Sequence, residues 1–144
     1  MSAVLLDTSV ASLLHPRRRA STLLALYEAD LRGKTLAVDL QTVAELWSWA
    51  DENGWGSEQR AGLRRFVSHF VVLPHTMEVA ERWAQVMVGA RRRGRRLEAG
   101  DAWIAAAAVA YTIPLVTHDQ DFVGLEIAVV KRLTAGNPGQ AGRR

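Results

Sequence analysis

Val4-Leu5-Leu6-Asp7-Thr8-Ser9 places a short apolar run directly before an acid and two hydroxyl side chains. An apolar run of this kind predicts a buried strand, and Thr8 or Ser9 is suited to cap a helix that runs toward His15. The stretch therefore predicts a strand, a turn and a helix, with Asp7 at the point where the strand ends.

The same alternation of apolar runs and helical patterns continues along the chain. We expect further buried strands at residues 35–38, 71–73, 115–116 and 127–130. Between them, the sequence predicts helices that end at Gly33 and near Asn53, that begin at Ser57 and Thr76, and that cover residues 101–111. This alternation predicts an α/β fold, with a mostly parallel five-stranded sheet sandwiched between helices.

Length and composition agree with a single domain. The chain has 144 residues, of which 49% are hydrophobic and 23% charged. A domain of this size buries enough surface to fold without disulfides or structural metals. We assign residues 1–133 to this domain and expect the Gly-rich residues 134–144 to form a disordered basic tail.

Several classes of protein are excluded by what the sequence lacks. The chain contains no Cys, which excludes disulfides, thiolate metal sites and thiol catalysis. No apolar run reaches the roughly 18 residues needed to span a membrane, and Asp7 interrupts the N-terminus before a signal-peptide core forms. We therefore expect a cytoplasmic protein that makes no membrane contact.

The net charge of +3 is small, but the cations are unevenly placed. Eight of the 18 Lys and Arg residues fall in two short arginine runs: Arg17, Arg18 and Arg19, and Arg91, Arg92, Arg93, Arg95 and Arg96. Guanidinium groups match phosphate oxygens in a planar, two-pronged geometry, so the runs suggest a polyanion as partner. A solvated helix end explains the same runs without any ligand.

Acidic residues stand where a parallel α/β sheet binds its ligands, just beyond the carboxyl ends of strands. Asp7 follows the first strand, and Asp119 follows the strand near residue 116, with Asp121 two positions later. Asp101 lies in the first turn of a predicted helix, where the helix dipole stabilises an ionised carboxylate. Glu45 is the only acid in the apolar segment Val43-Ala44-Glu45-Leu46-Trp47, so it needs a reason to be there.

A group of carboxylates without matching cations is the typical setting of a divalent metal. The carboxylates raise one another's pKa values unless a cation neutralises them, and Mg²⁺, or Mn²⁺ in its place, prefers oxygen ligands. The four His residues show no paired ligand spacing. Each acid also has a structural explanation, because Asp7 can cap a helix, Asp101 can carry an N-terminal charge, and Asp119 and Asp121 can form a turn.

Four short motifs together resemble the PIN-domain family. They are Asp7-Thr8-Ser9, Thr42-Val43-Ala44-Glu45-Leu46, Asp101-Ala102-Trp103-Ile104-Ala105-Ala106 and Thr117-His118-Asp119-Gln120-Asp121-Phe122. Each motif is weak alone, whereas their order and separation are specific. More narrowly, the chain is similar to the VapC-type toxins of toxin-antitoxin pairs. The resemblance implies a PIN-like domain with Mg²⁺- or Mn²⁺-dependent endoribonuclease activity, a homodimer, and inhibition by a small cognate antitoxin.

The resemblance also implies roles for individual residues. Asp7, Glu45 and Asp101 match the three dependable acids of the family, and Asp119 matches the more variable fourth. Asp121 departs from the pattern, so whether Asp119 or Asp121 is the fourth acid stays open. Small hydroxyl residues accompany these acids and would orient the carboxylates or nearby waters, with helix capping and turn formation as the alternative role: Thr8, Ser9 and Thr117.

The expected reaction is hydrolysis of an RNA phosphodiester by a metal-activated water. We expect Asp7 and Asp101 to bind the metal directly, and Glu45 and Asp119 to complete the site or act through waters. The arginine runs would guide the RNA backbone, because a carboxylate cluster repels it. The substrate would be a tRNA, rRNA or mRNA, and the sequence does not choose among them.

Two other functions compete with this interpretation. A receiver-type signalling domain also places acids at strand ends, but it needs an acid after the third strand, where Val71-Val72-Leu73-Pro74-His75 supplies none. A catalytically silent module that binds nucleic acid or protein would keep the fold without a working metal site.

Apolar residues of the helical region around Trp49 would suit an antitoxin or dimer contact, although core packing also explains Leu46 and Trp47.

Overall fold

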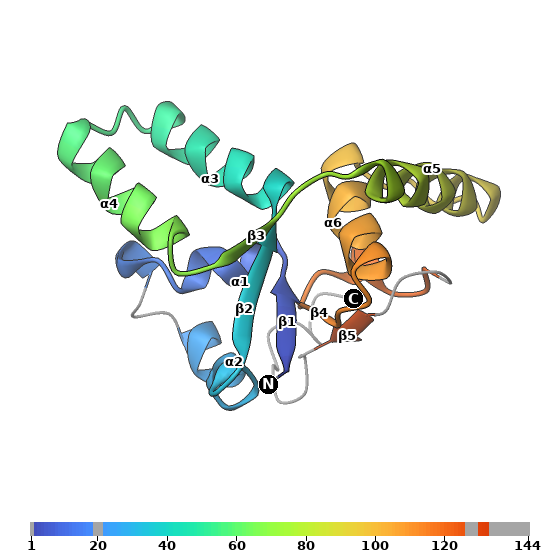
Figure 1. Cartoon of the computed structure of the whole chain (residues 1–144), viewed down its shortest axis with the longest axis horizontal. Helices are drawn as coiled ribbons and strands as arrows, with labels where there is room; N and C mark the ends of the chain where they lie inside the picture. Colours follow the sequence, from blue (N-terminus) through green and yellow to red (C-terminus); the bar gives the residue numbers. More distant parts are fainter. Residues whose placement is uncertain (1, 19–21, 126–129, 133–144) are drawn as a thin grey trace.

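The computed structural model describes residues 2–18, 22–125 and 130–132 (Figure 1). The elements follow one another as β1 (Ala3–Leu6), α1 (Thr8–Leu13), the 3₁₀ helix η1 (Pro16–Arg18), α2 (Thr22–Leu31), β2 (Thr35–Asp39), α3 (Leu40–Glu52), α4 (Ser57–Val67), β3 (Val71–Leu73), α5 (Met77–Arg92), α6 (Ala99–Ala110), β4 (Leu115–Thr117), the 3₁₀ helix η2 (Gln120–Phe122) and β5 (Val130–Arg132). The predicted basic tail at residues 134–144 lies outside the described residues.

The five strands form one parallel sheet in the order β3-β2-β1-β4-β5. The central strand β1 pairs on both sides, with Leu5 opposite Ala37 of β2 and Leu115 of β4. The α/β fold and the five-stranded parallel sheet are thus confirmed. The last strand differs from its prediction, since residues 126–129 lie outside the described residues and β5 begins only at Val130. Receiver domains have the strand order 2-1-3-4-5, which this sheet does not share.

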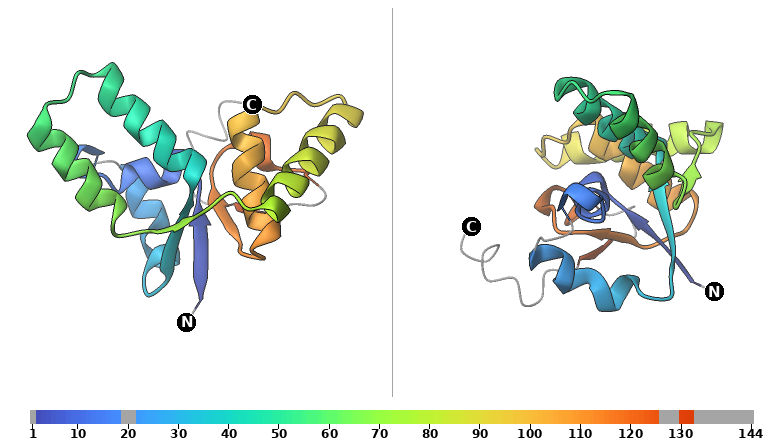
Figure 2. Two further views of the ribbon diagram at one scale, coloured as in Figure 1. Left: turned by 45° about the horizontal axis from the view of Figure 1, so that its top comes forward. Right: turned by 90° about the vertical axis from the view of Figure 1, so that its left-hand side faces the viewer.

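Alternate side chains of β1 face the two layers of helices, as strand geometry requires. Leu5 joins a core with apolar residues of α5 and α6, including Val86 and Ile104. Val4 and Leu6 face the opposite core, which α1 and α2 cover. Figures 1 and 2 show the sheet between these layers, with α3 and α4 forming an arm beside them. The sandwich of helices and sheet is therefore confirmed.

Local sequence signals set most helix ends, with one correction. Thr76 caps α5 through its hydroxyl, and Gly33 follows α2 with a φ of 76°, a conformation that favours glycine. The cap of α1 is Asp7, rather than Thr8 or Ser9, because the Asp7 carboxylate accepts the hydrogen bond from the backbone N–H of Val10. No helix in the described ranges is both long and apolar enough to cross a membrane.

Candidate active site

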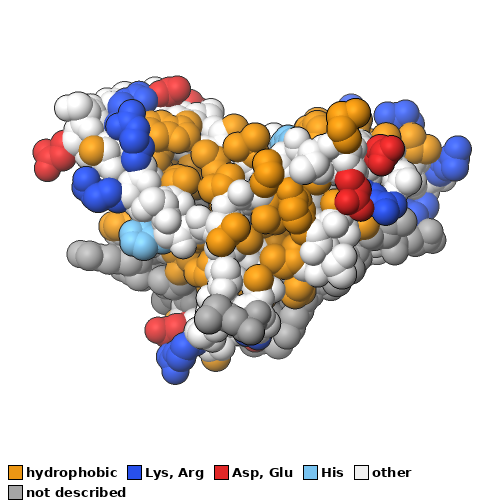
Figure 3. All heavy atoms as spheres, in the orientation of Figure 1, with side chains coloured by type: hydrophobic (Ala, Val, Ile, Leu, Met, Phe, Trp, Pro, Cys, Tyr) orange, Lys and Arg blue, Asp and Glu red, His pale blue; other side chains and the backbone are white. Residues whose placement is uncertain are grey.

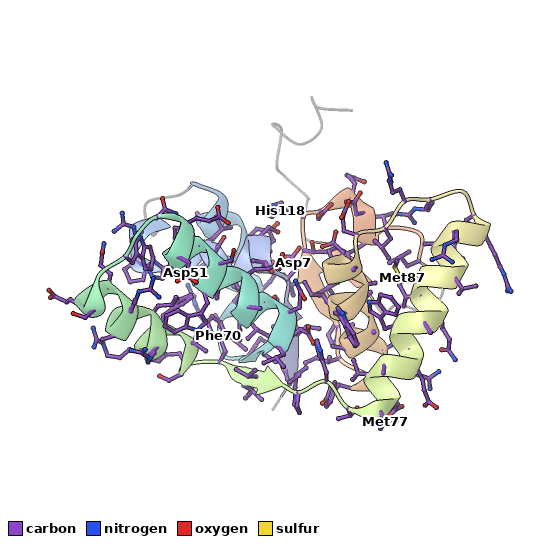
Figure 4. All side chains as sticks on the ribbon, turned by 90° about the horizontal axis from the view of Figure 1, so that it is seen from above. Asp7, Asp51, Phe70, Met77, Met87 and His118 are labelled. Atoms are coloured by element: carbon purple, nitrogen blue, oxygen red, sulfur yellow. The ribbon has the colours of Figure 1, made fainter. Side chains whose placement is uncertain are left out.

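A pocket opens at the carboxyl edge of the sheet, where β1 and β4 end between α3 and α6. Figure 4 looks down on this edge and shows Asp7 and His118 between the two helices. The pocket has a volume of about 370 Å³ and combines all four predicted acids with hydroxyl and apolar groups: Asp7, Thr8, Ser9, Ser12, Glu45, Leu46, Trp49, Asp101, Ile104 and Asp119. Segments far apart in the sequence therefore bring their acids to one place.

Asp7 is held by several donors. Its Oδ1 accepts hydrogen bonds from Ser9 Oγ at 2.8 Å and from the backbone N–H of Val10 at 2.9 Å, and its Oδ2 accepts one from Thr117 Oγ1. The side chain is only 3% exposed. Burial raises the pKa of Asp7, and the hydrogen bonds from Thr117, Val10 and Ser9 partly offset that rise. The carboxylate is thus fixed in one orientation at the floor of the pocket.

Glu45 reaches the pocket from the first half of α3. Its Oε1 accepts a hydrogen bond from Thr8 Oγ1, which also lies 3.0 Å from Thr42 Oγ1. Thr42 is fully buried, whereas Glu45 is exposed. The hydroxyl of Thr8 therefore links α1 to α3 and gives Glu45 a reason to sit in an otherwise apolar segment.

The carboxyl group of Asp101 has a strongly raised pKa. It lies in the first turn of α6 and is half-buried. Desolvation, followed by the negative charges of Asp119, Asp121, Glu45 and Asp7, raises the pKa of Asp101 to about 7. All four neighbouring acids repel the ionised form of Asp101, so a cation bound among them would stabilise that form.

Asp119 and Asp121 lie on the turn after β4. Oδ1 of Asp119 accepts the backbone N–H of Asp121 at 2.9 Å, and the backbone N–H of Asp119 donates to Thr117 Oγ1 at the same distance. One carboxylate oxygen from each of Asp101, Asp119 and Asp121 lies within 4.8 Å of the others. Asp7 lies in the same pocket but is not in this closest group, and the choice between Asp119 and Asp121 stays open because both are near Asp101.

The donor set fits a hard divalent cation. All the acids offer oxygen ligands, and no cation of the described residues forms an ion pair with Asp7, Glu45, Asp101, Asp119 or Asp121. The hydroxyl of Thr8 donates to Glu45, and the hydroxyls of Ser9 and Thr117 donate to Asp7. Their role in orienting the acids toward a metal remains a prediction.

One strand-end acid was not recognised from the sequence. Asp39 ends β2 and caps α3 by accepting the backbone N–H of Gln41 at 2.9 Å, and His75 Nε2 lies 2.9 Å from the same carboxylate oxygen. Asp39 is fully buried, and burial raises its pKa. His75 in turn stacks on Trp103 with ring centroids 4.2 Å apart. Asp39 follows a buried strand just as Asp7 does, so the same argument from strand ends would have selected it. In the structure, however, Asp39 caps α3 and contacts His75.

The arginine runs take different positions. Arg17 lies over the Trp55 ring at 5.1 Å, and Arg91, Arg92 and Arg93 are exposed at the end of α5. Arg96 is also exposed, whereas Arg95 is half-buried and donates to backbone carbonyls of the turn after β4. Arg19 and the side chain of Arg18 lie outside the described residues.

Leu46 and Trp55 are buried, which confirms core packing for Leu46.

Comparisons with known proteins identify relatives of this fold. The profile of the PIN domain family matches residues 4–127. Ribonuclease VapC5 of Mycobacterium tuberculosis is 34% identical over 68 residues, which make up 47% of this chain and 50% of that protein. The aligned part therefore spans only half the length of this curated relative.

Two solved structures extend the similarity to nearly the whole chain. VapBC-5 of M. tuberculosis, described as a member of the VapBC family of toxin-antitoxin systems, is 27% identical, with a TM-score of 0.65 over 92% of this chain and 98% of that one. VapBC2 of Rickettsia felis, solved with a DNA fragment from the promoter, gives a TM-score of 0.75 over 90% and 98% of the two chains. At 16% identity, the second similarity shows the fold alone.

Proposed function

The chain belongs to the PIN domain family, and we propose that it is a divalent-metal-dependent endoribonuclease that acts as the toxin of a toxin-antitoxin pair. The observation that carries the proposal is the convergence of Asp7, Glu45, Asp101 and Asp119 on one pocket, from segments spread over most of the sequence. The similarity to a protein named as a ribonuclease agrees with it.

Each acid has a separate task in this proposal. Asp101, with Asp119 or Asp121, holds Mg²⁺ or Mn²⁺, and Asp7 holds it from the end of β1. Glu45 is exposed and is suited to accept a proton from the attacking water, with Thr8 fixing its carboxylate. When bound, the metal supplies a lowered water pKa and neutralises charge on the scissile phosphate.

RNA requires positive charge beside this acidic pocket. The exposed arginines at the end of α5 precede the connection that leads to Asp101. Arg17 lies over the ring of Trp55, which contacts Trp49 of the pocket. Phosphate contacts of this kind position a strand but do not read its sequence. The proposal therefore assigns the arginines to binding and leaves the choice among tRNA, rRNA and mRNA to the shape of the RNA.

The partners in this proposal are an antitoxin and a second copy of the chain. Structures of toxin-antitoxin systems are among those that this chain resembles, which supports an antitoxin as inhibitor. Apolar side chains gather across the centre of the face shown in Figure 3, and exposed ones include Leu40, Val71 and Met77. A homodimer would cover such a patch. Because RNA and an antitoxin are cytoplasmic, we place the action of the protein there.

Cleavage of total RNA and of end-labelled structured RNAs tests the enzyme. The purified protein is incubated with Mg²⁺, Mn²⁺ or EDTA, beside Asp7→Asn and Asp101→Asn, after circular dichroism has shown that both variants fold. We expect metal-dependent cutting that both substitutions abolish. Cutting that persists in EDTA or in both variants would contradict the assignment of the pocket.

The silent binding module is the second candidate function. It is favoured by the structural tasks that the acids already perform, since Asp7 caps α1 and Asp119 caps η2. Isothermal titration with Mn²⁺ separates the two functions. A nuclease binds the metal and loses it in Asp101→Asn, whereas a silent module binds none while still binding RNA or protein.

A further inference from the structure

Arg95 lies in the connection between α5 and α6, within the arginine run that the sequence assigns to RNA. We propose that Arg95 is instead a positioning residue, which fixes the turn carrying Asp119 and Asp121 against the start of α6. This inference rests on the proposed function, because it assigns Arg95 a task in assembling the acidic metal site. It also separates Arg95 from the exposed arginines around it.

The contacts of the guanidinium group carry the first step. Nη2 of Arg95 donates to the backbone carbonyl of Asp121 at 2.8 Å, and Nη1 donates to the carbonyl of Val123. The three residues are 26 and 28 positions apart in sequence, so the contacts join separate segments. Two parallel donors on one rigid plane fit two carbonyls of one turn, a geometry that a lysine ammonium does not reproduce.

The turn is built around that guanidinium group. Gly124 has a φ of +82°, and a Cβ atom there would lie 3.2 Å from Nη1 of Arg95. Phe122, between the two bonded carbonyls, is only 1% exposed and packs in the core with Ile104 of α6. The turn therefore approaches Arg95 closely on one side and is held in the core on the other.

The other end of the link is equally fixed. The backbone N–H of Arg95 donates to the carbonyl of Ala90 at 2.8 Å, after Gly94 turns the chain with a φ of 69°. Leu97 is buried two residues later, and α6 begins at Ala99. Arg95 thus connects the segment that leads into Asp101 with the segment that carries Asp119 and Asp121.

The carboxylates themselves stay available. Arg95 bonds backbone carbonyls, and among the described residues it forms no ion pair with an acid. Oxygens of Asp101, Asp119 and Asp121 lie within 4.8 Å of one another despite their mutual repulsion. Hydrogen bonds from the guanidinium group to backbone carbonyls hold the turn without using the carboxylate oxygens, which leaves those oxygens for a cation.

Titration of the purified protein with Mn²⁺ alone, without RNA, tests the role of Arg95. Arg95→Gln removes both guanidinium donors in their forked geometry, and Arg95→Lys keeps the charge but lacks the planar fork. We expect Mn²⁺ affinity to fall about 10- to 100-fold in Arg95→Gln, the range for residues that orient metal ligands, and less in Arg95→Lys. Arg96→Gln is the matched control, expected to weaken RNA binding while Mn²⁺ affinity stays unchanged.

Two further measurements make the outcome decisive. Hydrogen exchange at the backbone amides of Phe122 and Val123 should accelerate in Arg95→Gln and not in Arg96→Gln, whatever the metal does. In RNA cleavage at saturating Mn²⁺, KM for RNA should stay near the wild-type value in Arg95→Lys. Unchanged Mn²⁺ affinity and amide exchange, with a raised KM, would overturn the inference and return Arg95 to RNA binding. A wild-type protein that binds no Mn²⁺ contradicts the proposed function instead, and the amide exchange still decides whether Arg95 holds the turn.

Discussion

Thr117 donates a hydrogen bond from Oγ1 to Oδ2 of Asp7, although the two residues are 110 positions apart in sequence. The same hydroxyl accepts the backbone N–H of Asp119 at 2.9 Å. One fully buried side chain thus joins the ends of β1 and β4 and orients two acids of the pocket.

Replacing Thr117 with Val should destabilise the protein and weaken its metal binding. Valine keeps the shape but leaves Oδ2 of Asp7 and the backbone N–H of Asp119 without the Thr117 hydroxyl, which costs about 1–3 kcal/mol for a buried group. Because the Thr117 hydrogen bond lowers the pKa of Asp7, its loss also raises that pKa further. Urea unfolding measures the first effect and Mn²⁺ titration the second.

Thr117→Ser is the matched control for this change. Serine retains the hydroxyl and loses only a methyl group, so most of the stability and of the Mn²⁺ affinity should remain. A loss in the Ser variant as large as that in the Val variant would contradict the prediction, because serine keeps the hydroxyl and both of its hydrogen bonds.

The metal-free protein should lose stability as the pH rises toward neutrality. The pKa of Asp101 is raised from 3.8 to about 7, so the folded state binds its proton more strongly than the unfolded state. The stabilising contribution is therefore complete below pH 3.8 and is lost as the pH rises through about 7. Burial raises the pKa of Asp7 and Asp39 in the same direction.

Urea unfolding in EDTA at pH 5 and pH 8 checks the pH prediction. The wild-type protein should lose more stability between these values than Asp101→Asn, whose side chain does not titrate. Saturating Mg²⁺ should remove most of the difference, because a bound cation replaces the proton. Parallel pH profiles of the two proteins would contradict the assigned pKa of Asp101.

The order of elements in this fold is predictable because strands and helices have distinct local signals. Residues 4–6 and 115–116 are short and apolar, and Thr76 carries its own capping hydroxyl, so these elements needed no tertiary information. The cap of α1 was less predictable, since Asp7, Thr8 and Ser9 are all good capping residues. Only the packed structure decides that the Asp7 carboxylate caps the helix while Thr8 turns toward Glu45.

The acids of the pocket were predictable by position, but their individual tasks were not. Strand ends locate Asp7 and Asp119, yet the same rule fits Asp39, which bonds His75 outside the pocket. Which acids come closest depends on the turn after β4, where backbone contacts with Arg95 act over 26 residues or more. Side-chain to backbone contacts of this range leave no periodic pattern in a sequence.

Glu45→Gln should reduce RNA cleavage by about 10²- to 10⁴-fold while the fold remains intact. The amide still accepts the hydrogen bond from Thr8, but it cannot bind a proton or a cation as the carboxylate does. Because Glu45 is exposed, stability should change by no more than about 0.5 kcal/mol. Cleavage rates and urea unfolding check the two parts.

A second glutamate of α3 supplies the control. Glu52 is also exposed and also accepts a hydroxyl hydrogen bond, from Ser48 at 3.1 Å, but it does not line the pocket. Glu52→Gln should therefore leave cleavage unchanged. A similar loss of cleavage in both variants would mean that net charge, and not the position of Glu45, accounts for the effect.

Removing Arg91 and Arg92 together should weaken RNA binding and also make it less sensitive to salt. Both side chains are exposed in the last turn of α5, beside the connection that leads to Asp101. Each phosphate contact to a single strand contributes a slope of about −0.7 to the plot of log affinity against log salt, so the double Ala variant should lose up to roughly 1.4 of that slope.

Arg32→Ala is the control, because Arg32 lies at the opposite, amino edge of the sheet, between α2 and β2. Fluorescence anisotropy in the Asp101→Asn background, which we expect not to cleave RNA, measures binding alone. An equal change of slope in the Arg32 variant would show that overall charge, and not this cluster, binds the RNA.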